Sequence, residues 1–300
     1  MDLSTGINPV PYPVGNIKPE AWTRLPDTGA LAALEAAARA YYGVPDAAAM
    51  VAAPGTQALI QLLPRLMPAT RVAVLGPTYT EHAHCWRAAG HDVDTVPLDA
   101  APPDGAGLAV AVHPNNPDGH VHDVERLLAW AAQGRHLVID EAFTDTLPEQ
   151  SAVRYTGPEG PIVLRSFGKF FGLAGLRLGF AITDPETAGG LAAALGPWSV
   201  PGPALEIGAR TLADREWIAE TRRRLAADAA RLDAVMAPHT GPALGGTDLF
   251  RLYDMNGQDL HARLAGHGIW TRIFDDRPEL IRLGLPPDDA AFQRLTAALG

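Results

Sequence analysis

Short apolar runs alternate with helical segments between residues 56 and 195, and this alternation constrains the fold more than any other feature. The strand-like runs are Arg71–Leu75, Val93–Val96, Leu108–Val112, His136–Asp140, Pro161–Ser166 and Leu178–Ile182. The helical patterns are Gln57–Met67, Thr80–Ala89, Asp123–Ala132 and Pro185–Leu195. Strands that alternate with helices form mostly parallel sheets, so we expect an α/β domain that binds ligands at the carboxyl ends of its strands.

The two ends of the chain have a different pattern. A Pro-rich stretch precedes an Ala-rich helix at Leu31–Tyr42, and Ala204–Met236 indicates a long charged helix with a break near Asp214. Further strands are expected at Asp248–Tyr253, Ile269–Phe274 and Leu280–Leu283, and further helices at Gly257–Ala265 and Asp288–Leu299. We expect a large domain at 28–200, and an N-terminal arm (1–27) that packs with a small α+β domain (201–300).

Composition excludes several classes of protein. The 300 residues suffice to bury a large core without a structural metal, and the single cysteine, Cys85, excludes a disulfide framework or a Cys-based zinc cluster. The net charge of −10 argues against a nucleic-acid partner. The N-terminus does not have the pattern of a secretory signal, and the longest uncharged stretches are interrupted by Pro and Gly. We therefore expect a cytoplasmic globular protein with no membrane partner.

Lysine is almost absent from the chain. Only Lys18 and Lys169 accompany 22 arginines. Arginine stays protonated, whereas a desolvated lysine can lose its proton and act as an amine nucleophile. Either both lysines are chance survivors of a composition that favours Arg, or one of them occupies a position where Arg cannot replace it.

The segment from Ser166 to Phe180 makes Lys169 a stronger candidate for an amine nucleophile than Lys18. It follows an apolar strand and contains four glycines, and at three of them, Gly168, Gly172 and Gly175, a backbone could approach a ligand closely. The neighbouring aromatic residues would desolvate the Lys169 amine and lower its pKa. Ser166 and Arg177 could together bind a phosphate. The alternative is a Gly-rich loop that carries a surface lysine.

The strand expected at His136–Asp140 ends in an acidic residue. Asp140 follows Val138 and Ile139, at the end of the sheet where α/β domains bind ligands. A buried carboxylate needs a positive partner, and a protonated pyridine ring would be one. A helix cap or a metal-binding acid is the alternative for Asp140.

Three weaker signals also follow strands. Asn116 lies in a turn after Leu108–Val112, and its amide could donate to a phenolate oxygen. Gly55, Thr56 and Gln57 form a strand-to-helix junction whose free N–H groups would attract phosphate. Tyr79 could stack on a flat ring. Each has an ordinary alternative: an Asn/Pro/Gly turn, a glycine before a helix, and a packed aromatic side chain.

The histidines do not indicate a metal site. His82 and His84, like His120 and His122, are two residues apart, and on the helix expected at Thr80–Ala89 the first pair would not share a face. No third ligand or catalytic base is marked, so no metal is expected. We interpret the ten histidines mostly as surface or turn residues.

Taken in order, these motifs resemble the fold-type I enzymes that depend on pyridoxal 5'-phosphate (PLP), in the branch of histidinol-phosphate aminotransferase. The resemblance covers nearly the whole chain, and the Lys169 segment is its most specific part. Leu3–Pro9 and Pro54–Ile60 are most similar to the threonine-phosphate decarboxylases of cobalamin biosynthesis. The resemblance implies a homodimer, a fold-type I PLP-dependent transferase fold and PLP as cofactor.

The resemblance also implies a role for each site residue. Lys169 would bind PLP covalently, Asp140 would pair with the pyridine nitrogen, Asn116 would bond the ring oxygen and Tyr79 would stack on the ring. The residues that would hold the cofactor phosphate are Gly55, Thr56, Ser166 and Arg177, with Gln57 close by. Arg282 would bind the substrate carboxylate and Arg272 would bind its phosphate. Asn8 would also bind substrate, from an arm that closes over the site.

Three positions depart from the aminotransferase pattern. Phe143 stands where these relatives usually have a tyrosine that bonds the ring oxygen, and Leu25 stands where a tyrosine reaches the cofactor phosphate of the neighbouring subunit. Gly168 replaces a second phosphate-binding hydroxyl. These departures weaken the transfer of aminotransferase activity.

Two reactions share almost all of these residues. The resemblance implies decarboxylation of L-threonine O-3-phosphate to (R)-1-aminopropan-2-yl phosphate. The alternative is an aminotransferase that acts on histidinol phosphate or an aromatic amino acid. The orientation of the substrate decides between them, because only the bond perpendicular to the cofactor ring breaks. A catalytically silent PLP-binding module is a third hypothesis, disfavoured by the complete set of Lys169, Asp140, Asn116 and Arg177.

Overall fold

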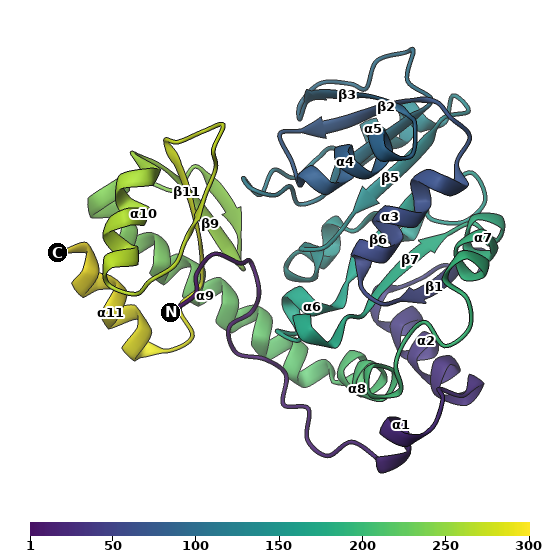
Figure 1. Ribbon diagram of the computed structural model, residues 1–300, viewed down its shortest axis with the longest axis horizontal. Helices are drawn as coiled ribbons and strands as arrows, with labels where there is room; N and C mark the ends of the chain where they lie inside the picture. The colour runs from purple at the N-terminus through teal and green to yellow at the C-terminus, as the bar shows by residue number, and fades with distance from the viewer.

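A seven-stranded sheet forms the centre of the larger lobe in the computed structural model, which describes residues 1–300 (Figure 1). Its strand order is β1-β7-β6-β5-β4-β2-β3. Only β7 is antiparallel to its neighbours, so the mostly parallel α/β sheet expected from the sequence is confirmed. The strands are β1 (Ala49–Ala53), β2 (Arg71–Gly76), β3 (Asp92–Pro97), β4 (Leu108–Val112), β5 (His136–Asp140), β6 (Ile162–Ser166) and β7 (Gly179–Thr183).

Helices cover both faces of this sheet because its central strands are apolar on both sides. Val72 and Val74 of β2 pack on one face, whereas Ala73 and Leu75 pack on the other. The first face is covered by α3 (Thr56–Leu66), α4 (Thr80–Ala88) and α7 (Pro185–Leu195), and the second by α5 (Val124–Ala131). This double cover leaves the carboxyl ends of the parallel strands as the open edge of the layer.

A second, antiparallel sheet lies in the smaller lobe. Its strand order is β10-β11-β9-β8, with β8 (Gly245–Thr247), β9 (Phe250–Asp254), β10 (Arg272–Ile273) and β11 (Leu280–Gly284). Helices α10 (Gly257–Gly266) and α11 (Asp289–Leu299) belong to the same lobe. The strand expected at Ile269–Phe274 is wrong in length: only two residues pair with β11, and Trp270 instead accepts a backbone hydrogen bond from Leu3.

The long helix expected after Pro201 is broken as the sequence predicts. Helix α8 (Gly202–Ala213) ends at Asp214, whose side chain accepts a hydrogen bond from the Trp217 N–H and so caps α9 (Arg215–Thr240). Helix α9 runs beneath both lobes in Figure 1. Its buried residues Leu225 and Leu232 belong to a core cluster that also contains residues of the small sheet and of α2 (Thr28–Tyr42). The division into domains at 27 and 200 stays a prediction.

The N-terminal arm crosses from the small lobe to the large one. Gly284 donates a backbone hydrogen bond to the Leu3 carbonyl, and Asn8 donates one to the carbonyl of Lys169, at distances of 2.7 and 2.9 Å. Lys169 lies in the short helix α6 (Phe167–Phe170), and the arm continues to α1 (Pro19–Thr23). No helix of the protein is both long and apolar enough to cross a membrane.

Candidate active site

The last residues of β4, β5 and β6 meet at one pocket of about 180 Å³. These residues are Val112, Asp140 and Ser166. All nine residues that the sequence analysis assigned to cofactor binding line this pocket: Gly55, Thr56, Gln57, Tyr79, Asn116, Asp140, Ser166, Lys169 and Arg177. The structure therefore brings together residues that are more than 120 positions apart in the sequence.

One end of the pocket is suited to an anion. Helix α3 begins at Thr56 directly after Gly55, whose φ of +84° favours glycine. A side chain at Gly55 would meet the Arg177 guanidinium at 2.6 Å, so this cation lies against the start of the helix. Free N–H groups at a helix N-terminus, a guanidinium and the Ser166 hydroxyl together suit a phosphate.

The pocket also contains a buried carboxylate. Asp140 is only 3 % exposed, its Oδ1 accepts a hydrogen bond from the Ala142 N–H, and its Oδ2 lies 2.9 Å from His82 Nε2. His82 is itself 1 % exposed. This contact was not expected from the sequence, where the histidines of α4 were considered only as possible metal ligands.

The interpretation of the histidines as mostly surface or turn residues is therefore wrong in part. His82, His91, His113 and His122 are buried. His91 Nε2 lies 2.7 Å from the Pro64 carbonyl oxygen, and burial lowers the pKa of His122 to about 4. His82 and His84 do lie on different sides of α4, since His84 is exposed. No group of three His, Cys, Asp or Glu side chains in residues 1–300 is arranged to hold a metal ion.

Lys169 lies at the junction of the pocket with a larger cleft. Burial lowers the pKa of its amine, and the nearby Arg282 and Arg177 lower it further, whereas Asp140 raises it. Its Nζ lies 5.7 Å from the centre of the Phe143 ring. The sequence-based expectation of a desolvated amine next to aromatic rings matches this environment.

Tyr79 is placed by a chain of polar contacts. Its hydroxyl donates to Gln57 Oε1 at 3.2 Å, and Gln57 Nε2 donates to Glu81 Oε2 at 2.8 Å. Tyr79 is 38 % exposed and lines both the pocket and the cleft, so its ring is available to cover a flat ligand. Gln57 reaches the pocket, but its side-chain amide is used by these two partners.

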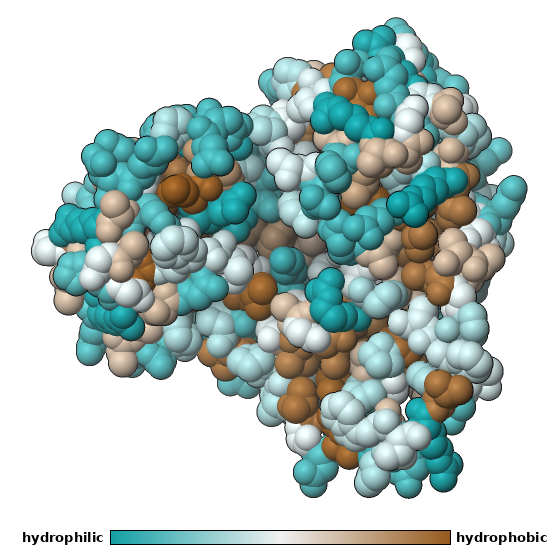
Figure 2. Space-filling model, viewed as in Figure 1, coloured by the Kyte–Doolittle hydropathy of each residue, from teal (hydrophilic) through white to brown (hydrophobic).

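The cleft lies between the two lobes and has a volume of about 1340 Å³. The molecular surface is hollowed there, between the lobe of the small sheet and the lobe of the large sheet (Figure 2). Arg272 and Arg282, the two predicted substrate-binding arginines, line this cleft together with Lys169. They are directly opposite each other on β10 and β11.

Arg282 is held in place by protein oxygens but has no carboxylate partner. Its Nη1 donates to Asn116 Oδ1 and its Nη2 donates to the Ser4 carbonyl, whereas its buried Nε has no partner. Burial and the neighbouring Arg272 lower its pKa to about 10. Two like charges placed opposite each other on a sheet are unfavourable unless an anion lies between them. The pair is therefore suited to anionic ligands.

Asn8 is not brought into the pocket or the cleft. Its Nδ2 donates to the Phe170 carbonyl at 2.8 Å, and its Oδ1 accepts from Arg224 and from the Val10 N–H. All of its side-chain polar atoms are thus used to hold the arm. The residues of the arm that line the cleft are instead Ser4, Thr5 and Gly6.

A buried ion network lies behind the pocket and was not expected. Arg165 donates to Glu141 at 2.6 Å and to Asp145 at 2.7 Å, and all three side chains are at most 3 % exposed. Glu141 directly follows Asp140, and Arg165 directly precedes Ser166. The network therefore restrains the backbone next to these two pocket residues. Alternation along a strand explains why neighbouring residues face opposite sides.

The structure shows the surroundings of all three departures. Phe143 lines both the pocket and the cleft, and Leu25 is 67 % exposed and lies outside both. A side chain at Gly168 would meet the Cα of Ala174 at 2.7 Å, so this position has no room for a hydroxyl-bearing residue.

The donor set fits PLP. An anion site at α3, a buried carboxylate and a desolvated amine lie around one small pocket, and an aromatic ring borders it. These are the groups that would hold the phosphate, the pyridine nitrogen, the aldehyde carbon and the ring of PLP. The role of each residue stays a prediction.

Comparison with known proteins agrees with this donor set. Residues 16–245 match the family model of aminotransferase class I and II. The chain belongs to the aminotransferase class I and II family. A threonine-phosphate decarboxylase from Pseudomonas aeruginosa is 46 % identical over the whole chain and 91 % of that relative. A histidinol-phosphate aminotransferase from Desulfitobacterium hafniense is 29 % identical over 99 % of the chain and 90 % of the relative.

A solved structure supports the class I and II aminotransferase fold independently. Histidinol-phosphate aminotransferase from Sinorhizobium meliloti, solved in complex with pyridoxal-5'-phosphate, superposes with a TM-score of 0.84 at 22 % identity. The match covers 99 % of this chain and 89 % of the other. The fold-type I architecture expected from the sequence is thereby confirmed.

Proposed function

We propose that this protein is a PLP-dependent decarboxylase that converts L-threonine O-3-phosphate to (R)-1-aminopropan-2-yl phosphate, a step of cobalamin biosynthesis. The observation that carries the proposal is the pair of Arg272 and Arg282. They are cross-strand neighbours without carboxylate partners, and they line the same cleft as Lys169. A substrate with a carboxylate and a phosphate on neighbouring carbons supplies one anion to each.

The similarity to known proteins supports the same substrate. The relative named threonine-phosphate decarboxylase is 46 % identical, compared with 29 % for the relative named histidinol-phosphate aminotransferase. Histidinol phosphate also carries only one anionic group, so it would leave one arginine of the pair without a partner. The aminotransferase is therefore the weaker alternative.

Bound PLP supplies a sink for the electron pair of a bond at the substrate's α carbon. The Asp140 carboxylate would hold the proton of the pyridine nitrogen, and its contacts with His82 and Ala142 fix its orientation. The start of α3, Ser166 and Arg177 would hold the cofactor phosphate. Asn116 would contribute its Nδ2, since its Oδ1 already accepts from Arg282.

Lys169 supplies the amine that would attach the cofactor. Its lowered pKa gives it a larger neutral fraction than an exposed lysine has at the same pH, and only the neutral amine is a nucleophile. Lys169 would hold the cofactor before the substrate binds and again after the product has left.

The arginine pair would decide which bond breaks. Arg282 cannot rotate freely because it is bound to Asn116 and Ser4, so it would hold the carboxylate in one orientation. With Arg272 on the phosphate, the substrate would be held at two points, which would fix the direction of the bond from its α carbon to its carboxylate. That bond would then break, CO₂ would leave and one proton would return to the α carbon.

The test is to incubate the holoenzyme with O-phospho-L-threonine. We expect CO₂ and aminopropanol phosphate in equal amounts. A keto acid and pyridoxamine phosphate without CO₂ would contradict the proposal and favour the aminotransferase. Reduction with borohydride followed by peptide mapping should place the cofactor on Lys169, and a label at any other residue would contradict the assigned site.

The homodimer stays a prediction that rests on the family resemblance, and the cytoplasmic location stays a prediction from the sequence. Sedimentation at micromolar concentration would test the first. Leu25 and the neighbouring exposed Trp22 are positions at which substitution with a charged residue should weaken a dimer if this segment lies between subunits.

A further inference from the structure

The N-terminal arm supplies hydrogen-bond donors to the end of the helix that carries Lys169. The last carbonyl groups of any helix have no partner within it, and α6 has only four residues. The Asn8 N–H donates to the Lys169 carbonyl at 2.9 Å, and Asn8 Nδ2 donates to the Phe170 carbonyl at 2.8 Å. The Tyr12 N–H donates to the Phe171 carbonyl at 2.9 Å. Three consecutive carbonyl groups therefore accept hydrogen bonds from the arm.

The two donor residues of the arm are themselves fixed. Asn8 is 2 % exposed, and its Oδ1 accepts from Arg224 Nη2 at 2.7 Å and from the Val10 N–H at 3.0 Å. The Tyr12 hydroxyl donates to Asp214 Oδ2 at 3.1 Å. Arg224 belongs to α9 and Asp214 caps it, so residues 8–12 are anchored to the helix that runs beneath both lobes.

The arm packs against the chain after α6 without a gap. Gly172 has a φ of +68°, which favours glycine. A Cβ at this position would lie 2.7 Å from the Asn8 carbonyl oxygen and 2.7 Å from Pro11 Cα. The path of residues 169–172 is therefore constrained by the arm.

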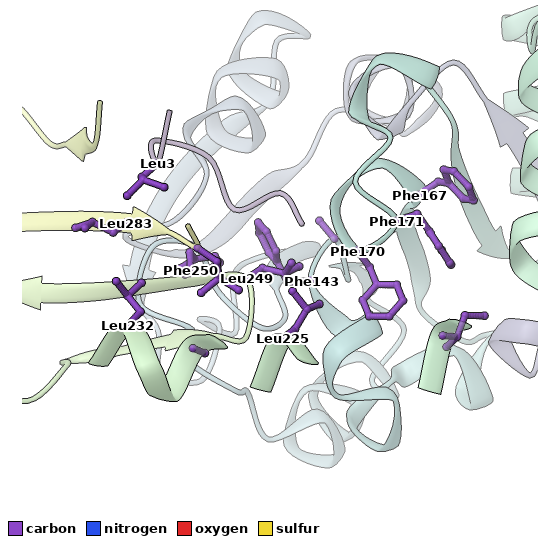
Figure 3. Close-up of a cluster of buried hydrophobic side chains, with 14 of the residues drawn as sticks. Leu3, Phe143, Phe167, Phe170, Phe171, Leu225, Leu232, Leu249, Phe250 and Leu283 are labelled. Carbon is purple, nitrogen blue, oxygen red and sulfur yellow. The ribbon is translucent and has the colours of Figure 1, made fainter. Parts of the chain in front are cut away.

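Helix α6 has few other means of fixing its backbone. A single helical turn is not stable by itself. The rings of Phe167, Phe170 and Phe171 are buried in the core, as Figure 3 shows, but these contacts leave the carbonyl groups at the end of the helix to other partners. Lysine has a long and flexible side chain, so the place that its amine reaches depends on the backbone that carries it.

We propose that Asn8 is a positioning residue for Lys169: by holding the carbonyl groups at the end of α6, it fixes the backbone from which the amine reaches the aldehyde carbon of PLP. The inference rests on the proposed function, in which Lys169 attaches the cofactor. The attachment is a condensation. The amine nitrogen forms a double bond to the aldehyde carbon, and the aldehyde oxygen leaves as water with the two protons of the neutral amine.

The test is Asn8→Asp, measured on the full-length apoprotein with two ligands. The substitution keeps an oxygen for Arg224 and for the Val10 N–H, but it replaces the donor to the Phe170 carbonyl with a second oxygen. The ligands are PLP and 4'-deoxypyridoxine phosphate, which has the same ring and phosphate but no aldehyde and so cannot be attached to a lysine. The affinity for PLP should fall by about tenfold, and the affinity for the deoxy compound should not change.

Asn16→Asp is the matched control, because it makes the same change in an exposed part of the arm. Only the backbone carbonyl of Asn16 is used, as an acceptor for Arg210. This variant should bind both ligands as the unmodified protein does. A general loss of stability would weaken both ligands alike. Equal weakening of both ligands by Asn8→Asp would therefore overturn the inference.

Gly172→Ala tests the same contact without changing a hydrogen-bonding group. Its Cβ would displace the arm from α6, so it should also weaken PLP by about tenfold and leave the deoxy compound unaffected. Gly43→Ala is its control: Gly43 has a φ of +67°, but a Cβ there would meet no atom within 4 Å. The control introduces the same backbone strain without moving the arm. Equal affinities of Gly172→Ala and Gly43→Ala for PLP would contradict the inference.

The outcomes separate the inference from the proposed function. If the unmodified enzyme releases CO₂ and Asn8→Asp keeps its full preference for PLP over the deoxy compound, the inference is overturned and the proposed function stands. If the unmodified enzyme forms only the keto acid while the two ligands give the expected pattern, the proposed function fails and the role of Asn8 stands. If the unmodified protein binds both ligands equally, Lys169 does not attach the cofactor and both fail.

Discussion

The imidazole Nε2 of His82 lies 2.9 Å from Oδ2 of Asp140, and both side chains are buried. His82 is the only side chain that Asp140 contacts by a hydrogen bond. It belongs to α4, whereas Asp140 ends β5, so the contact links a surface helix to the floor of the pocket. We infer that the orientation of the Asp140 carboxylate depends on His82.

His82→Ala should therefore weaken PLP binding. A hydrogen bond to a charged group contributes about 1.5–3 kcal/mol, which corresponds to about 10- to 100-fold in the dissociation constant. Titration of the apoprotein with PLP, followed by absorbance, measures the dissociation constant. His136→Ala is the control, because His136 begins the same strand β5 and is exposed. Equal affinities of the two variants would contradict the role of His82.

Lys169→Met should raise the melting temperature of the apoprotein near pH 7. The pKa of Lys169 is lowered in the folded state, so the unfolded state binds more protons between that pKa and the usual value of 10.5. Stability therefore rises with pH through this interval, and below it the buried amine destabilises the fold. A gain of about 1 kcal/mol corresponds to about 2–4 °C. The difference in melting temperature between Lys169→Met and the unmodified protein should become smaller as the pH approaches 10.5. A difference in melting temperature that does not depend on pH would contradict this explanation.

Arg272→Gln should reduce discrimination in favour of the phosphorylated substrate. Loss of a charged hydrogen-bond donor lowers kcat/KM for O-phosphothreonine by about 10- to 100-fold, whereas kcat/KM for threonine should change little. Arg282→Gln should lower both values, because both substrates carry the carboxylate. Steady-state kinetics with the two substrates separates these patterns. If both variants lose the two activities equally, the separate assignment of the anions to the two arginines is wrong.

Arg165→Met should destabilise the protein by about 3–5 kcal/mol, because it leaves two buried carboxylates without their cation. Urea denaturation measures the loss. The triple variant Arg165→Met/Glu141→Gln/Asp145→Asn removes the charges together and should recover part of the stability. Recovery of stability without recovery of PLP affinity would show that the network also positions Asp140 and Ser166. A triple variant no more stable than Arg165→Met would contradict the charge argument.

Gly179→Ala should weaken PLP binding by about tenfold, the effect of losing one charge-assisted hydrogen bond. A Cβ at this position would lie 2.6 Å from the Thr56 backbone nitrogen, so it would displace the start of α3. Gly189→Ala provides the matched control: it is in α7, and its added methyl group would meet no atom within 4 Å. PLP affinity equal in the two variants would contradict the role of α3 as the phosphate site.

Local patterns predicted most of the fold and the pocket because strand ends in a parallel sheet converge by topology. Asp140 and Ser166 were each recognisable as a polar residue at the end of an apolar strand. Because β5 and β6 are neighbouring parallel strands, their last residues lie close together. The break at Asp214 was predictable for a similar reason, since a helix cap is a local contact.

What could not be predicted depends on partners far away in the sequence. Strand β1, Ala49–Ala53, was expected only as the strand before the junction at Gly55, and its bounds were not predicted because alanine does not favour strands; its pairing with β7 more than 120 residues later stabilises it. His82 and Asp140 are 58 residues apart, and nothing near His82 reveals that α4 packs beside the end of β5. Asn8 was expected to reach substrate, but its position in the sequence did not reveal that α9 provides Arg224 as its partner.

The path of the arm has a consequence for how the protein is made. Its residues leave the ribosome before those of the two lobes, yet their hydrogen-bond partners, Lys169, Trp270 and Gly284, are synthesised more than 160 residues later. Contacts between such distant segments form slowly. The arm must therefore stay unfolded through most of translation, and a nascent chain stalled before Gly284 is expected to contain the complete large sheet but no working catalytic centre.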